Sequence, residues 1–106
     1  MSRAMVVAVA SAELWISGSE SLKDRRRVTR AVVDRLRARY NVSVLEMDEP
    51  LTWQRARLAV ACVSHDEHLA RELMDSVRRV MEGRADAELT EFSVVYYHQP
   101  SPAPAR

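Results

Sequence analysis

The residues with the clearest capacity for chemistry are the basic side chains between Ser21 and Tyr40. This stretch, SLKDRRRVTRAVVDRLRARY, holds eight basic residues and two acidic ones, whereas the rest of the chain is net acidic. Such a concentration of positive charge attracts anionic partners, and RNA is the first candidate among them. At helical spacing, five of the basic side chains share one stripe on the outer face. They are Lys23, Arg26, Arg27, Arg30 and Arg37.

These charges also have a simpler explanation, which is a solvated helix face whose arginines pair with nearby acids. Only Asp24 and Asp34 lie within the stretch, and Asp34 alone is expected on the basic face. We therefore favour anion binding, with an affinity that falls steeply as salt rises. Arg25, Arg35 and Arg39 are expected to serve the fold instead, the last two at the negative end of the helix dipole.

A second candidate lies in the segment LTWQRAR, which includes Trp53. A tryptophan on a loop with basic neighbours can stack on an unpaired base. The alternative is that the indole folds back over the end of the sheet. The candidate contact residues in this loop are Trp53, Gln54 and Arg55. Further candidates for stacking, on an open sheet face, are Trp15, Tyr96 and Tyr97.

Catalytic and metal-binding chemistry has little support in the sequence. His65, His68 and His98 have no cysteine or glutamate pattern that would complete a metal site. No nucleophile elbow, P-loop or paired carboxylate motif is present, and Cys62 lies in an apolar run typical of a buried thiol. An acylphosphatase-like hydrolase is the least favoured alternative, because the glycine-rich phosphate loop of that class is missing. We expect no enzyme activity, no metal and no cofactor.

Hydropathy predicts the elements that must position these side chains. Alternation with a period of two predicts strands at 4–17, 41–48, 57–64 and 88–98, the second at an edge or with a bulge, and a loop at 49–54. Helices are expected at 21–40 and from residue 64 to Gly83, opened by the motifs Ser21-x-x-Asp24 and Ser64-x-x-Glu67. Asn41 is expected to leave the first helix in the left-handed conformation. The predicted apolar stripe of the second helix is Leu69, Leu73, Val77 and Val80 or Met81.

The order β-α-β-β-α-β predicts an α+β fold, the ferredoxin-like βαββαβ sandwich. In this fold a four-stranded antiparallel sheet carries two helices on one face. We expect a single domain at residues 1–98 and a disordered, proline-rich tail at 99–106 that joins no sheet. The open face of the sheet must be polar, bind something or be covered by another subunit. Because the first and third strands are apolar on both sides, we favour partial covering, as in a homodimer.

Two of these motifs resemble a known family. The run SLKDRRRVTRAVVDRLRARYNVSVLEMD, followed by TWQRARLAVACVS, is similar to the bacterial YlxP-like family, a domain of unknown function, over roughly the whole domain. The resemblance implies a ferredoxin-like sandwich and no catalytic residue. Glu49 stands where many relatives are expected to have a histidine. The motif residues that carry over are Ser21, Leu22, Lys23, Asp24, Arg26 and Arg27, and then Trp53, Gln54 and Arg55.

Genes of that family commonly lie near those for translation initiation factor two and ribosome-binding factor A, which implies a role in ribosome maturation or translation. We therefore expect a small cytoplasmic, non-enzymatic protein that binds RNA or a ribosomal subunit through its basic first helix. The alternative is a dimeric regulatory or protein-interaction module that uses the open sheet face. Nothing in the sequence indicates specificity for DNA, and no apolar stretch reaches the roughly 20 residues that span a bilayer.

Overall fold

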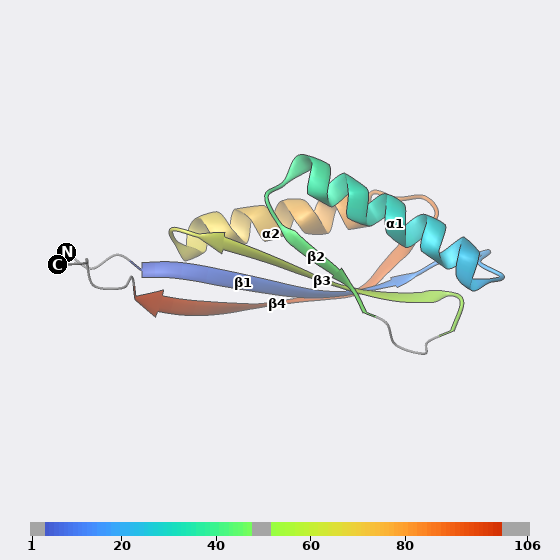
Figure 1. Ribbon diagram of the computed structural model, residues 1–106, viewed down its shortest axis with the longest axis horizontal. Coiled ribbons are helices and arrows are strands. Elements are labelled where there is room, and N and C mark those ends of the chain that lie inside the picture. The colour runs from blue at the N-terminus through green and yellow to red at the C-terminus, as the bar shows by residue number, and fades with distance from the viewer. Residues whose placement is uncertain (1–3, 48–51, 101–106) are drawn as a thin grey trace.

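The computed structural model describes residues 4–47 and 52–100. The four strands form one antiparallel sheet in the order β2-β3-β1-β4, and both helices lie against the same face of it (Figure 1). This arrangement confirms the predicted ferredoxin-like sandwich. The elements are β1 Ala4–Trp15, α1 Leu22–Arg39, β2 Ser43–Glu46, β3 Arg55–Ser64, α2 Glu67–Glu82 and β4 Glu88–Pro100.

The hydrophobic core lies between the two helices and the face of the sheet that they cover. The even-numbered residues of β1 point into it, and each of them from Val6 to Leu14 is at most 4% exposed. Leu58 and Val60 of β3 lie beside them. The helices close the core with residues that recur every three or four positions, as an amphipathic helix requires. These are Val32, Val33 and Leu36 of α1 and Ala70, Met74, Val77, Val80 and Met81 of α2.

The second helix begins later than predicted, and its buried stripe also differs from the prediction. Its cap is Asp66, whose Oδ1 accepts a hydrogen bond from the Leu69 amide at 2.9 Å. Ser64 cannot serve as the cap because it is the last residue of β3, paired with Val6 of β1. The predicted stripe was therefore wrong at its start: Leu69 is exposed, and Ala70 takes the buried position.

Two predictions about chain ends also need correction. Asn41 is not left-handed, since Gly18 alone among the described residues has a positive φ, at 81°, and α1 leaves through an extended Tyr40. Strand β4 runs on to Pro100, so the first two residues of the predicted tail belong to the sheet. Proline is tolerated there because β4 is an edge strand. Residues 101–106 and Glu49 lie outside the described residues.

Strand β2 is the other edge of the sheet, and an edge position was one of the two alternatives predicted for it. Its four residues pair regularly with β3, from Ser43 opposite Ala61 to Glu46 opposite Leu58, so no bulge lies there. The irregular register is found instead between β1 and β4, after Glu13. Within the described ranges no helix is long and apolar enough to cross a membrane.

Candidate anion-binding surface

The first turn of α1 is held by two side chains of the first motif. Ser21 Oγ accepts a hydrogen bond from the Asp24 amide at 3.1 Å, which confirms the predicted cap. The Asp24 carboxylate has two further partners: Oδ2 accepts from the Glu20 amide and Oδ1 from Arg27 Nη2, each at 3.1 Å. Satisfying the free amides at a helix start in this way fixes the direction in which the following arginines point.

The three consecutive arginines after Asp24 have different surroundings, because successive helical residues are rotated by about 100°. Arg25 turns toward β3 and donates from Nη1 to the carbonyl oxygens of Thr52 and Arg55, at 3.4 and 3.3 Å. Arg26 is exposed. Arg27 pairs with Asp24, but at an exposed position where an ion pair contributes little to stability.

The second motif packs against the first. The Ile16 amide donates to the carbonyl oxygen of Gln54 at 2.6 Å, and Gln54 Nε2 donates to the carbonyl oxygen of Ser19 at 3.2 Å. Together with the two bonds from Arg25, these contacts fasten the 52–55 turn beside the start of α1. Two motifs that are about 30 residues apart in the chain thus form one continuous surface.

Two of the predicted contact residues also hold the fold together. Gln54 is half-buried and uses its amide to hold the turn. Arg37 donates from Nη2 to the carbonyl oxygen of Val44 at 2.9 Å, which ties the last turns of α1 to β2. In contrast, Trp53 is 52% exposed and Arg55 is also exposed. The indole therefore keeps half of its surface accessible beside the basic helix.

Lys23, Arg26 and Arg30 are exposed and form no ion pair with any other described residue. We call these three residues, together with Arg27, the α1 basic surface. A shallow pocket of about 280 Å³ adjoins it, between α1 and the β2–β3 hairpin. Four arginines and a single acid line that pocket, so its potential is positive. The lining residues are Arg25, Arg26, Thr29, Arg30, Glu46, Met47, Ala56 and Arg57.

The other aromatic candidates divide between the two faces of the sheet. Tyr97 and Trp15 lie on the open face and are 56% and 39% exposed. Tyr96 does not lie there, since it packs against the core with the Arg71 guanidinium 4.4 Å above its ring. Burial raises the pKa of its hydroxyl. Tyr96 is therefore a contact between β4 and α2, and the stacking role predicted for it is wrong.

Two of the three histidines lie beside glutamates, and the cysteine is buried. His98 Nε2 lies 2.7 Å from Glu67 Oε1, and His68 Nε2 lies 3.1 Å from Glu72 Oε1. Across residues 4–47 and 52–100, no three side chains of the types that bind metals converge on one point. Cys62 is buried, and desolvation raises the pKa of its thiol, so the thiolate that a nucleophile requires is disfavoured at neutral pH.

Comparison with known proteins identifies the family. Residues 7–94 match the family described as "Protein of unknown function (DUF503)". The chain belongs to this family. A relative in Bacillus subtilis (strain 168), described as "Uncharacterized protein YlxP", is 34% identical over 59 residues, which cover 56% of this chain. The match spans 64% of the length of that relative, less than two thirds. This family membership confirms the YlxP-like resemblance of the two motifs.

A solved structure supports the fold. The protein is described as a dimeric ferredoxin-like protein of unknown function from Thermobifida fusca, and it superimposes with a TM-score of 0.53. Its sequence is 15% identical, and the match covers 88% of this chain and 90% of that one. At that level of identity the likeness extends to the fold alone.

Proposed function

We propose that this protein binds single-stranded RNA, such as a loop of ribosomal RNA, through the α1 basic surface and the neighbouring Trp53, and that it has no catalytic role. The observation that carries this proposal is the junction of the two motifs. Arg25 fastens the 52–55 turn to the start of α1, so that the exposed Trp53 belongs to a turn held beside the helix that carries three cations without an ion-pair partner among the described residues.

This combination suits single-stranded RNA more than a duplex. Lys23, Arg26 and Arg30 would each contact a phosphate, because they have no carboxylate partner among the described residues. Trp53 would stack on an unpaired base, a contact that tolerates any sequence. A cytoplasmic location stays a prediction from the sequence.

Salt dependence tests the phosphate contacts. Three contacts to single-stranded RNA predict that affinity falls about 20-fold between about 50 and 200 mM salt. Fluorescence anisotropy with a labelled ribosomal RNA loop measures this slope. The double variant Arg26→Gln/Arg30→Gln should lose about two thirds of the slope as well as affinity. A matched control is Arg78→Gln on α2, whose side chain pairs with Glu82.

The indole is tested separately. Trp53→Ala should weaken RNA binding by about 1–3 kcal/mol while leaving the salt slope unchanged, because stacking releases no counterions. The proposal is wrong if binding at low salt is weaker than millimolar. It is equally wrong if the Arg26→Gln/Arg30→Gln variant binds RNA as the unchanged protein does.

A second candidate function is a homodimeric module that uses the open sheet face. The specific observation is an apolar area on that face, where Val7 of β1 lies between Val63 of β3 and Tyr97 of β4. In the next row Val9 lies between Ala61 and Val95. The description of the Thermobifida fusca protein as dimeric is consistent with such a use of the fold. Exposed apolar patches of this kind commonly mark interaction sites.

Sedimentation equilibrium distinguishes the two states. A dimer would have twice the chain mass of 12.1 kDa, and Val95→Glu should return it to the monomer mass by placing a charge in the apolar area. A monomer at every concentration would exclude this second function and leave the RNA-binding proposal untouched.

A further inference from the structure

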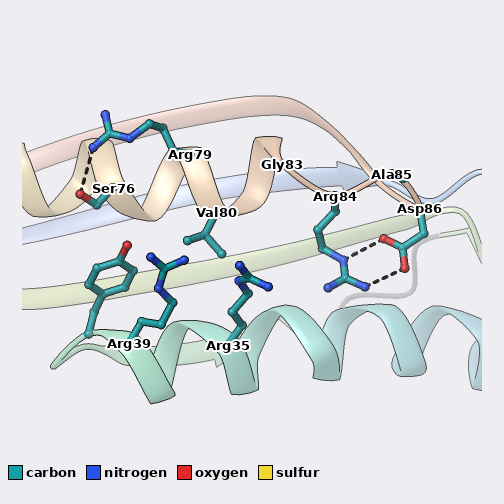
Figure 2. Close-up of a pocket in the computed structure, with 10 residues that line it drawn as sticks. Arg35, Arg39, Ser76, Arg79, Val80, Gly83, Arg84, Ala85 and Asp86 are labelled. Carbon is teal, nitrogen blue, oxygen red and sulfur yellow. Dashed lines mark hydrogen bonds and ion pairs between the residues drawn. The ribbon is translucent and has the colours of Figure 1, made fainter.

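A second basic region lies on the opposite side of α1. Arg35 and Arg39 are each nine residues beyond Arg26 and Arg30, a rotation of about half a turn. They face a groove of about 660 Å³ between the C-terminal parts of α1 and α2 (Figure 2). That volume lies within the range of small-molecule sites, about 300–1,000 Å³.

The groove is lined by four arginines and one acid. Arg84 holds Asp86 through two short hydrogen bonds, at 2.8 and 2.7 Å, and this pairing lowers the pKa of the Asp86 carboxyl. The charges of this pair therefore cancel. Arg35, Arg39 and Arg79 have no carboxylate partner among the residues that the structure describes. Three positive charges remain in the lining.

The remaining contacts of these arginines are weak or neutral. Arg39 lies beside the ring of Tyr40, 5.6 Å from its centroid. Arg79 lies along α2 and donates from Nη2 to Ser76 Oγ at 3.1 Å. In Figure 2 the side chains of Arg35 and Arg39 extend from α1 toward α2, with Val80 on the facing side. The guanidinium groups of Arg35 and Arg39 thus keep donors on the side of the groove that an anion could use.

Helix dipoles do not account for all of this charge. Both helices end beside the groove, at Arg39 and Glu82, where free carbonyl groups carry about half a negative charge per helix. Against three unpaired guanidinium groups, the two helix ends leave about two positive charges uncompensated. The dipole interaction expected for Arg35 and Arg39 from the sequence therefore explains part of their placement only.

We propose that this groove binds a small ligand with two adjacent phosphate groups, either inorganic pyrophosphate or the diphosphate of a nucleotide. Guanidinium forks match phosphate oxygens in geometry as well as in charge. Arg35 and Arg39 rise about 6 Å apart along the helix, so each can hold its own phosphate. Two phosphates carry about three negative charges, and the lining has three arginines without a carboxylate partner to balance them.

Isothermal titration of the full chain at low salt tests this site, with inorganic pyrophosphate as the probe and orthophosphate and sulfate as single-anion controls. Pyrophosphate should bind at least about tenfold more tightly than either control, because a second charge-assisted contact is added. A nucleoside diphosphate forms the last arm: tighter binding than pyrophosphate identifies the nucleotide as the ligand, and equal or weaker binding identifies the inorganic ion.

Variants separate this groove from the α1 basic surface. Arg35→Gln and Arg39→Gln should each weaken pyrophosphate binding about tenfold or more. Arg30→Gln on the opposite side of α1 and Arg78→Gln beside Arg79 should leave it unchanged. Circular dichroism verifies that each variant is folded, and backbone amide shifts at Ser76 and Gly83 report binding in the groove itself.

Two results would overturn the proposal. One is equal affinity for pyrophosphate, orthophosphate and sulfate, which would mean that the groove attracts anions only by its net charge. The other is a loss of pyrophosphate binding in Arg30→Gln as large as that in Arg35→Gln. RNA binding is measured in the same variants. Its survival in Arg35→Gln or its loss in Arg30→Gln tests only the proposed RNA-binding function, so the two proposals are tested independently.

Discussion

The two faces of the sheet carry similar apolar residues but differ in their exposure to solvent. On the covered face, Val6, Val60 and Leu58 are at most 1% exposed. On the open face, Val63, Val95 and Tyr97 have more than half of their surface accessible. Strand β3 thus carries a buried valine on its covered face and an exposed valine on its open face. Apolar character alone therefore does not make a strand face part of the core, because a helix must also cover it.

A matched pair of valines on β3 gives the largest expected difference between the faces. Val60→Ala should lower the free energy of unfolding by about 2 kcal/mol, because two buried methyl groups are lost and a cavity remains. Val63→Ala should change it by less than about 0.5 kcal/mol in the monomer. Urea unfolding followed by circular dichroism measures both values.

The control for this pair is protein concentration. If Val63→Ala costs as much as Val60→Ala and the cost grows with concentration, the open face is buried in a dimer. A large cost that is independent of concentration would contradict the assignment of Val63 to the open face.

Removal of the N-terminal cap of α1 is expected to have the next largest effect on stability. Ser21→Ala should destabilise the protein by about 1 kcal/mol, because the Asp24 amide loses its acceptor, whereas Ser21→Gly should cost only a few tenths. Thermal unfolding ranks the three proteins. A cost for Ser21→Ala below that of Ser21→Gly would show that the cap does not hold α1 over the sheet.

The smallest effect concerns the link between α2 and β4 at the rim of the covered face. Hydrogen bonds from His98 and Arg71 lower the pKa of Glu67. A carboxyl whose pKa is lower in the folded state stabilises the fold at pH values above its unfolded pKa. That contribution is lost as pH falls through the pKa of Glu67 in the folded protein, which lies below the ordinary glutamate value. Unfolding curves from neutral to acid pH should show a small loss that Glu67→Gln lacks.

Much of the fold could be predicted from the sequence, and the misses have physical causes. Ser64 and Asp66 are both good caps, and only the pairing of Ser64 with Val6 decides between them. Pro100 appeared incompatible with a sheet until the strand order placed β4 at an edge. In both cases the local preference failed because a neighbouring strand decides the outcome.

The candidate surface divides in a similar way. The outward direction of Lys23, Arg26 and Arg30 follows from helical spacing and was predictable. Arg37 shares that spacing but is bound to the Val44 carbonyl of a neighbouring strand, which no pattern in α1 could indicate. The arginine groove was missed because its residues come from two helices and the turn after α2. The arginine-rich C-terminal end of α1 was the one sign of this groove in the sequence.

The kind and order of the elements are predictable from the sequence, because periods of two and 3.6 residues and the cap of α1 are local properties. Which face of β1 and β3 the helices cover depends on the assembled structure, since both faces of these strands are apolar and alternation cannot distinguish them. The assembled structure also determines which partners the arginines take. That outcome depends on carbonyl and carboxyl groups brought near by folding, such as Val44 for Arg37 and Asp86 for Arg84.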